Sequence, residues 1–217
     1  MWDWINNSSG WLAGAINLVG QNPEWSLVVA FLAAIIEALA LVGTVIPGTF
    51  IVMGVAGAAA AAGQAKWPFL AVAVLGAVIG DFLSYWLGFH FRHAVRQWGP
   101  FARRPQLMAS ADRFFQRYGS YSVALCRFIP VLRSTVPLAA GVAGMSRKQF
   151  LIANVSSALV WAPAHVCPAQ LAGLSIDRLR EGDWLSAAWL GAGVLACCVA
   201  VWWLHRRLTP LVLAARR

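Results

Sequence analysis

The sequence predicts an all-α membrane protein, a polytopic helical bundle, and three observations lead to this fold class. Hydrophobic residues make up 60% of the 217 positions and charged residues only 12%, a composition typical of multispanning membrane proteins. Apolar runs of about twenty residues, long enough to cross a bilayer core of ~30 Å, recur along the chain. Two further segments are apolar but interrupted by proline, glycine or arginine, which predicts broken hairpins inside the membrane.

The positive charge of the chain, +9 at neutral pH, lies in short arginine clusters between apolar segments. The preference of cytoplasmic loops for Lys and Arg explains such clusters, so we expect no nucleic-acid partner. The four cysteines lie in apolar stretches, where they serve as small buried side chains. Because no disulfide or zinc spacing is visible, the sequence predicts no metal site and no cofactor.

We expect three parts along the chain. Residues 1–25 contain several tryptophans among polar residues, which predicts a short interfacial segment. Residues 26–173 would form the membrane domain. Residues 174–217 would form a final transmembrane helix and a basic cytoplasmic tail.

Unbroken apolar runs predict membrane spans at 27–46, 67–91, 150–171 and 184–204. Residues 92–119 carry six arginines and one acid between aromatic side chains, which predicts an amphipathic helix on the cytoplasmic surface. Residues 175–183 would form a short loop on the outer side.

The segment at 121–144, YSVALCRFIPVLRSTVPLAAGVAG, is apolar but contains two arginines and two prolines. An arginine at the centre of a membrane helix costs roughly 2.5–3.5 kcal/mol on insertion scales. A straight helix would place Arg127 and Arg133 about 240° apart, whereas breaks at Pro130 and Pro137 would bring both guanidinium groups to one point. We therefore predict a re-entrant broken hairpin that holds two arginines over a polar cavity.

The second interrupted segment, at 47–64, starts with residues that shape a turn, Pro47, Gly48 and Thr49. Small residues follow, which favour close helix packing. The sequence GVAG occurs here at 54–57 and again at 141–144, where it begins with Gly141. If the basic clusters and the C-terminus are cytoplasmic, the two broken segments enter the membrane from opposite faces, as in an inverted-repeat transporter.

Four ionisable residues are expected at mid-membrane depth: Glu37, Asp81, Arg127 and Arg133. They could simply neutralise each other in a structural core, but buried ion pairs rarely stabilise relative to apolar replacements, and intramembrane charges usually mark a pathway. Because a guanidinium group binds phosphate oxygens two at a time, Arg127 and Arg133 are the predicted phosphate ligands. Burial disfavours an ionised carboxylate, so Glu37 would exchange a proton unless an arginine holds it ionised.

Asp81 is expected to pair with an arginine or with Tyr85, one helical turn further on. Asn154, within the predicted span at 150–171, is a secondary polar candidate.

Four motifs occur in order: VIPGT after Glu37, GxxxGDxxSYWLG at 76–88, CRFIPVLRSTVPLAAGVAGM at 126–145, and FxxxN at 150–154 with Trp161. With these motifs the chain resembles the bacterial DedA family, which shares the VTT or SNARE-associated membrane fold, over roughly residues 25–173. The resemblance implies a lipid transporter or scramblase of the bacterial cytoplasmic (inner) membrane. Members are associated with flipping undecaprenyl phosphate or phosphatidylethanolamine, and some depend on the proton motive force.

The resemblance also implies roles for single residues. Glu37, Arg127 and Arg133 match family positions that are needed for activity. Many members carry Asp or Glu directly after the Pro-Gly pair, where this chain has Thr49.

Two other classes compete with a lipid transporter, and a homo-oligomer stays open in each case. A membrane enzyme acting on lipid phosphates is one, but the four histidines are not spaced for a phosphohistidine step, so we expect no enzyme. A structural or assembly protein with charge pairs in its core is the other. It predicts that Arg127→Lys and Arg133→Lys are tolerated, whereas bidentate phosphate binding would not tolerate them.

Overall fold

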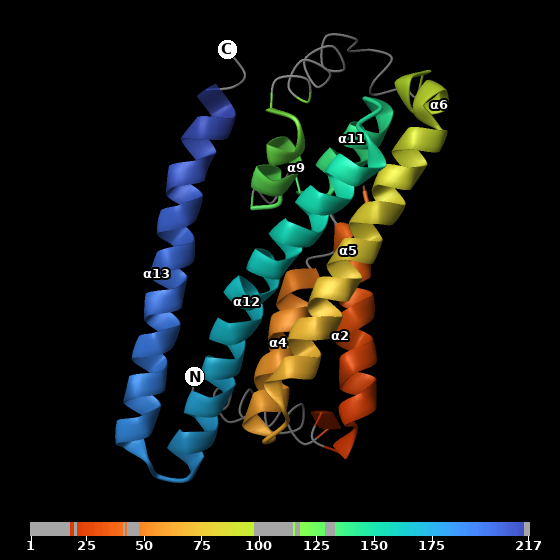
Figure 1. Ribbon diagram of the computed structural model, residues 1–217. Coiled ribbons are helices and arrows are strands. Elements are labelled where there is room, and N and C mark those ends of the chain that lie inside the picture. Colours follow the sequence, from red (N-terminus) through yellow and green to blue (C-terminus); the bar gives the residue numbers. More distant parts are fainter. Residues whose placement is uncertain are drawn as a thin grey trace, which may run out of the picture.

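The structure is a computed structural model, and it describes residues 18–19, 21–40, 42, 48–97, 115, 118–128 and 133–214. Over these ranges the chain is almost entirely helical and contains no strand (Figure 1). In chain order the helices are α2 (Pro23–Ala38), α4 (Gly48–Ala61), α5 (Lys66–His90), α6 (Arg92–Gln97), α9 (Ser120–Cys126), α11 (Thr135–Val142), α12 (Arg147–Arg180) and α13 (Trp184–Ala214).

Two pairs of short antiparallel helices point toward each other from opposite ends of the molecule (Figure 1). We call α2 with α4 the first hairpin and α9 with α11 the second hairpin. Their helices have 16, 14, 7 and 8 residues, fewer than the ~20 that cross a bilayer. Each hairpin therefore extends only part of the way along the molecule.

The helices α5 and α12 run past both hairpins. They have 25 and 34 residues, roughly 37 and 51 Å at 1.5 Å per residue. Within the described part of the chain, these two helices are long and apolar enough to span a membrane.

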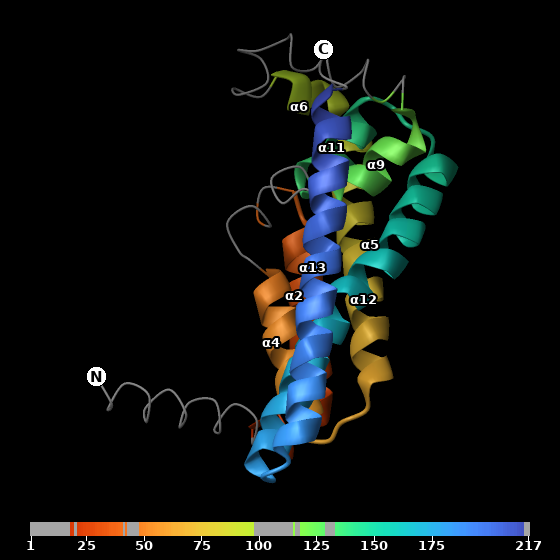
Figure 2. The same ribbon diagram turned by 90° about the vertical axis from the view of Figure 1, so that its left-hand side faces the viewer.

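The helix α13 lies antiparallel along α12 (Figure 2). The turn between them contains Gly182 at φ 80°, a conformation that glycine adopts without strain. Asp183 Oδ1 then accepts the backbone N–H of Ser186 at 3.1 Å, which caps the start of α13. This hydrogen bond lowers the pKa of the Asp183 carboxyl.

Each hairpin packs against the long helix that follows the other one, α4 on α12 and α11 on α5. Glycines permit both crossings. A Cβ at Gly173 would overlap the carbonyl oxygen of Gly57, and a Cβ at Gly88 would overlap that of Leu138, while Gly141 meets the α5 backbone in the same way. Such backbone contacts are typical of membrane helices. The two GVAG sequences supply Gly57 and Gly141 from their fourth and first positions, so the sequence repeat does not place equivalent residues at the two crossings.

The core has one part beside each hairpin. The first packs α2, α4, α5 and α12 around Phe69 and Trp161, and the second packs α5, α9, α11 and α12 around Tyr85 and Phe150. The outer surface is rich in exposed large apolar side chains, for example Trp25, Phe50, Ile152, Trp189 and Leu195. An outer surface of this kind is expected where a protein faces lipid.

The predicted span at 27–46 is wrong in being unbroken, because its helix is interrupted after Ala38, and residues 41 and 43–46 lie outside the described residues. The helix α2 ends at Ala38, and Leu39 is extended with ψ 130°, so Glu37 lies in the last turn rather than at the midpoint of a span. Ser84 on α5 compensates the broken backbone, since its hydroxyl donates to the Ala38 carbonyl at 3.1 Å and accepts the Ala40 N–H at 2.9 Å.

The predicted span at 150–171 and loop at 175–183 are also wrong in their bounds. The helix α12 runs from Arg147 to Arg180 through Pro163 and Pro168. Each proline removes one donor, but leaving the helix in apolar surroundings would unpair many more backbone groups. The helix α13 likewise continues beyond residue 204 to Ala214, where a tail was expected.

The remaining predicted elements agree with the structure or lie mostly outside it. The helix α5 matches the predicted span at 67–91, and α4 falls within 47–64. Of the interfacial segment at 1–25, only residues 18–19 and 21–25 are described, and residues 98–114 of the predicted amphipathic helix are outside the described residues.

Candidate functional site

An ion pair lies where the two hairpins meet. Arg133 is two residues before α11, Glu37 is in the last turn of α2, and Arg133 Nη1 is 2.9 Å from Glu37 Oε1. Thr49, in the first turn of α4, joins both groups, because its hydroxyl donates to Glu37 Oε1 and accepts from Arg133 Nη1 at 3.0 Å. The Arg133 guanidinium carbon is 4.9 Å from the centre of the Trp161 ring on α12, a cation–π contact. We call these four residues the hairpin-tip site.

Gly48 brings the two arms of the first hairpin together at this point. A Cβ there would lie 2.5 Å from the Ala33 carbonyl oxygen and 2.7 Å from Glu37 Cβ, distances that no side chain tolerates. The next residue, Thr49, is thereby placed against Glu37. Pro47, which was expected to shape the same turn, lies outside the described residues.

One oxygen of Glu37 has no hydrogen-bond partner among the described residues. Oε1 accepts the hydrogen bond of the Thr49 hydroxyl and pairs with Arg133. Among the described residues, Oε2 is the one buried side-chain nitrogen or oxygen that forms no hydrogen bond. Leaving such an atom unpaired costs about 1–3 kcal/mol, and more when it is charged. The Arg133 side chain is 12% exposed, so the site combines a free acceptor with an incompletely enclosed cation.

A second ion pair joins Arg127, directly after α9, to Asp81 near the middle of α5. Arg127 Nη1 also donates to Ser157 Oγ at 2.9 Å and to the Asn154 carbonyl at 2.7 Å, and Nη2 donates to Asn154 Oδ1 at 3.0 Å. The Asn154 amide in turn donates to the Val78 carbonyl at 3.0 Å. We call Asp81, Arg127, Asn154 and Ser157 the buried network. Its arginine has both terminal nitrogens occupied by protein.

The two predicted phosphate ligands therefore stand in different surroundings. Arg127 and Arg133 each pair with a different acid, although Arg133 is near enough to Asp81 for the charges to interact. Asp81 pairs with an arginine, as one alternative predicted. The Tyr85 hydroxyl instead donates to the Met145 carbonyl at 2.6 Å.

Two of the residues expected to shape the second hairpin, Pro137 and Gly141, lie within the described part of the chain. Pro137 is the third residue of α11, and in a first turn its missing N–H has no helical partner to lose, so it belongs to the start of a helix. Gly141 lies at the crossing with α5. The break itself falls between Cys126 and Thr135, and Pro130 lies outside the described residues.

The sequence alone predicts no site role for Ser157, Trp161 or His165. His165 Nδ1 is 2.8 Å from the Trp161 carbonyl oxygen, and the two rings are 4.9 Å apart. The available signal was their spacing: residues 154, 157, 161 and 165 recur every three or four positions, which places them on one face of α12. Among the described residues, no group of three or more His, Cys, Asp or Glu could hold a metal ion.

These features define a class: an all-helical membrane protein with an apolar outer surface and charged residues paired in its interior. The chain belongs to the VTT-domain family, the DedA family, because the family model matches residues 46–171.

Curated relatives support this assignment, and the printed name of one of them gives its location. Inner membrane protein YabI of Escherichia coli (strain K12) is 29% identical over 199 residues, covering 88% of this chain and 76% of the relative. Protein DedA of the same organism is 28% identical over 149 residues, covering 66% and 67%. The comparison with solved structures gives no match. The names of the relatives place the chain among bacterial inner membrane proteins.

Proposed function

We propose that this protein moves a lipid with a phosphate headgroup, undecaprenyl phosphate or a phospholipid, between the leaflets of the membrane. The observation that carries the proposal is the hairpin-tip site, where an arginine and a carboxylate with one unpaired oxygen meet between two broken elements. A membrane protein that retains such a pair at the contact of its hairpins has a place where an anion and a proton can compete.

The proposal includes a position in the membrane. Both hairpins would be re-entrant from opposite faces, because their helices are too short to span, while α5 and α12 cross completely. Exposed tryptophans occur at the ends of α2, α5 and α13 that lie together at one end of the molecule, namely Trp25, Trp67 and Trp184, and tryptophan is enriched at membrane interfaces. The opposite end carries Arg92, Arg147 and Lys148, so it would be cytoplasmic, together with the C-terminus.

The chemistry follows from the hydrogen bonds of Arg133. A phosphate group would accept two N–H bonds from its guanidinium and would replace Glu37 as the counter-ion. Glu37 would then take up a proton on Oε2. The proton removes the charge of Glu37, so the phosphate no longer competes with a second anion for Arg133. When the phosphate leaves, Glu37 loses the proton and pairs again with Arg133. Trp161 would keep the guanidinium in place during the exchange.

Arg127 takes a different role in this proposal. Its two terminal nitrogens already donate to five oxygens, namely one of Asp81, two of Asn154, one of Ser157 and the Ala77 carbonyl. A phosphate could therefore bind Arg127 only by breaking several of these hydrogen bonds. We assign Arg127 to positioning: it fixes the end of α9 against α5 and α12. The phosphate ligand is Arg133.

The test is transfer in liposomes. Purified protein is reconstituted with a fluorescent polyprenyl phosphate or phospholipid, and the accessibility of the label in the outer leaflet is followed over time. Arg133→Ala should lower the protein-dependent rate at least about tenfold, and Arg133→Lys should also lower it because a lysine cannot bind bidentately.

Arg178→Ala is the matched control. Arg178 forms a half-exposed ion pair with Glu181, so this variant should leave the transfer rate unchanged. A wild-type rate from the Arg133→Ala protein would contradict the proposal.

A structural role is the second candidate, and the one-to-one pairing of two acids with two arginines favours it. In that case wild-type liposomes would show no transfer above protein-free liposomes. Arg133→Lys, which keeps the ion pair with Glu37, would also preserve the thermal stability of the protein and its assembly with other proteins.

A further inference from the structure

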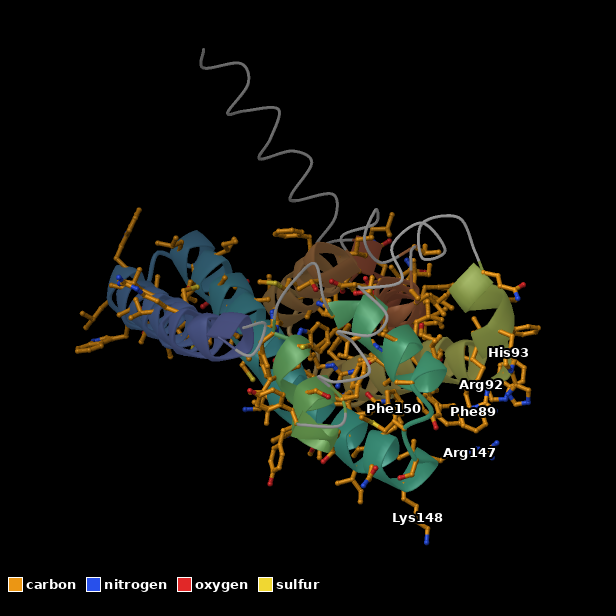
Figure 3. All side chains as sticks on the ribbon, turned by 90° about the horizontal axis from the view of Figure 1, so that it is seen from above. Phe89, Arg92, His93, Arg147, Lys148 and Phe150 are labelled. Atoms are coloured by element: carbon orange, nitrogen blue, oxygen red, sulfur yellow. The ribbon has the colours of Figure 1, made fainter. Side chains whose placement is uncertain are left out.

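A group of basic side chains lies at one edge of the molecule (Figure 3). Arg92 and His93 begin α6, and Arg147 and Lys148 begin α12. All four side chains are exposed, and Figure 3 shows them in order along the edge with Phe89 between Arg92 and Arg147. We call these four residues the basic edge.

Aromatic packing holds the two arginines of the basic edge in place. The guanidinium carbons of Arg92 and Arg147 are 5.9 and 5.6 Å from the centre of the Phe89 ring. Phe89 is stacked with Tyr85 at 6.0 Å, and Tyr85 is stacked with Phe150 at 4.2 Å. Because these rings are part of the core, the arginines are oriented before any ligand arrives, which reduces the entropy lost on binding.

The backbone that carries Arg147 is fixed by the same cluster. The Tyr85 hydroxyl donates to the Met145 carbonyl at 2.6 Å, two residues before Arg147. Gly144 adopts φ 76° in the turn before α12, and a Cβ there would reach Arg92 Nη1 at 4.0 Å. A hydrogen bond therefore joins α5 to the turn before α12, and the beginning of α6 lies beside that turn.

Among the residues that the structure describes, the basic edge has no carboxylate partner, because none of its residues forms an ion pair with an acid. Arg147 and Lys148 also occupy the first turn of a long helix, where the macrodipole is positive and cations are disfavoured by about 0.3–1 kcal/mol each. The positive end of the helix dipole thus repels Arg147 and Lys148, and a bound anion would offset this repulsion.

We propose that the basic edge binds the headgroup of an anionic glycerophospholipid. Large apolar side chains are exposed close to it along the chain, namely Leu87 on α5, Phe91 at the C-cap of α5 and Ile152 on α12. This arrangement of cations above an apolar surface fits a lipid, with phosphate at the cations and acyl chains along the helices. A zwitterionic lipid fits less well, since no described acid is present to receive its ammonium group.

This inference does not depend on the proposed transport function. The basic edge and the hairpin-tip site share no residue, so binding at the edge can be tested in protein that moves no lipid.

The experiment measures lipid retention by native mass spectrometry. Full-length protein in detergent is titrated with phosphatidylglycerol, and the population carrying lipid is compared with a parallel titration with phosphatidylcholine. Arg92→Gln with Arg147→Gln should weaken phosphatidylglycerol retention roughly thirtyfold, from about 1 kcal/mol per cation near a charged lipid surface. Raising the salt concentration should weaken wild-type retention, because exposed charges are screened.

Two variants serve as controls. Lys66→Gln with Arg178→Gln removes two cations from the opposite ends of α5 and α12 and should leave retention unchanged. Arg92→Lys with Arg147→Lys keeps the charge and should retain most of the binding while confirming that the edge folds.

Several results would overturn the proposal. One is equal retention by the Gln variant and the wild type, and another is equal loss in the opposite-end control. A third is equal retention of phosphatidylcholine and phosphatidylglycerol by the wild type. If soluble glycerol phosphate displaces phosphatidylglycerol at millimolar concentration, the edge is a site for free phosphate rather than for a lipid.

Discussion

The two buried ion pairs of this protein contain the same kinds of groups in different settings. Arg127 and Asp81 are enclosed, with side chains 5% and 7% exposed, and the guanidinium is surrounded by acceptors. Arg133 and Glu37 lie at the contact of the two hairpins, where the arginine is 12% exposed and one carboxylate oxygen is unpaired.

The difference separates structural from reactive charge. A guanidinium that donates to several acceptors cannot exchange partners without breaking several hydrogen bonds together. A pair with an unpaired oxygen at a contact between two elements can exchange one partner at a time. The number of acceptors around the guanidinium, more than burial, thus distinguishes the buried network from the hairpin-tip site.

The largest expected effect is on folding. Arg127→Met leaves Asp81 as an uncompensated buried charge, so we expect a loss of about 3–5 kcal/mol in the free energy of unfolding. Arg133→Met should cost about 1.5–3 kcal/mol, the value of a hydrogen bond to a charged group, because Thr49 still donates to Glu37. Denaturant or thermal unfolding in detergent measures both.

The double variant Asp81→Leu with Arg127→Met is the control for this prediction. Removing both charges should recover part of the stability lost in Arg127→Met, since apolar replacements of buried pairs are often neutral. Equal losses for Arg127→Met and Arg133→Met would show that the two pairs do not differ as described.

The next effect concerns pH. If Glu37 and the phosphate compete for Arg133, lower pH protonates Glu37 and frees the arginine, so headgroup binding strengthens as pH falls, at most about tenfold per pH unit for one exchanged proton. Glu37→Gln cannot ionise and should bind with little pH dependence. Binding of a labelled phospholipid, whose phosphate diester stays ionised, measures the difference between pH 6 and pH 9.

Asp81→Asn provides the comparison for the pH experiment. It removes a carboxylate from the buried network but leaves Glu37 unchanged, so folded Asp81→Asn protein should keep the wild-type slope. A flat wild-type profile, or a slope that survives in Glu37→Gln, would exclude Glu37 as the titrating group.

Much of the fold follows from the sequence. Composition and hydropathy predict a helical membrane protein, and the interruptions at 47–49 and 127–137 predict two broken elements. The end of α2 at Ala38 could not be predicted, because it depends on Ser84, which is 46 residues away and supplies hydrogen bonds to the broken backbone. The continuation of α12 through Pro163 and Pro168 also contradicts local propensity, since tertiary surroundings decide whether a helix survives a proline.

The sequence predicts which charged residues form the candidate site, but it does not predict which acid pairs with which arginine. The four charged residues could be selected by their depth in apolar segments, yet the choice of Asp81 for Arg127 and Glu37 for Arg133 depends on how α5 and the first hairpin pack against the second hairpin. Thr49 was noted as a difference from other family members. Its position between Glu37 and Arg133 follows from the absence of a Cβ at Gly48, which no local pattern reveals.

The smallest expected effect compares two hydroxyls, one in each ion pair. Thr49 and Ser157 both accept a hydrogen bond from an arginine Nη1, at 3.0 and 2.9 Å. Thr49 alone also donates to the carboxylate, and Arg127 Nη1 has the Asn154 carbonyl as a second acceptor. Thr49→Val should therefore cost about 1 kcal/mol of stability, the usual net value of a hydrogen bond, and Ser157→Ala should cost less.

Thr49→Ser keeps the hydroxyl and separates its contribution from that of the lost methyl packing. If Thr49→Ser retains wild-type unfolding while Thr49→Val does not, the hydroxyl links Glu37 to Arg133. A larger loss in Ser157→Ala than in Thr49→Val would reverse the comparison, because it would mean that the buried network depends on single contacts and that the hairpin-tip site is the better satisfied of the two.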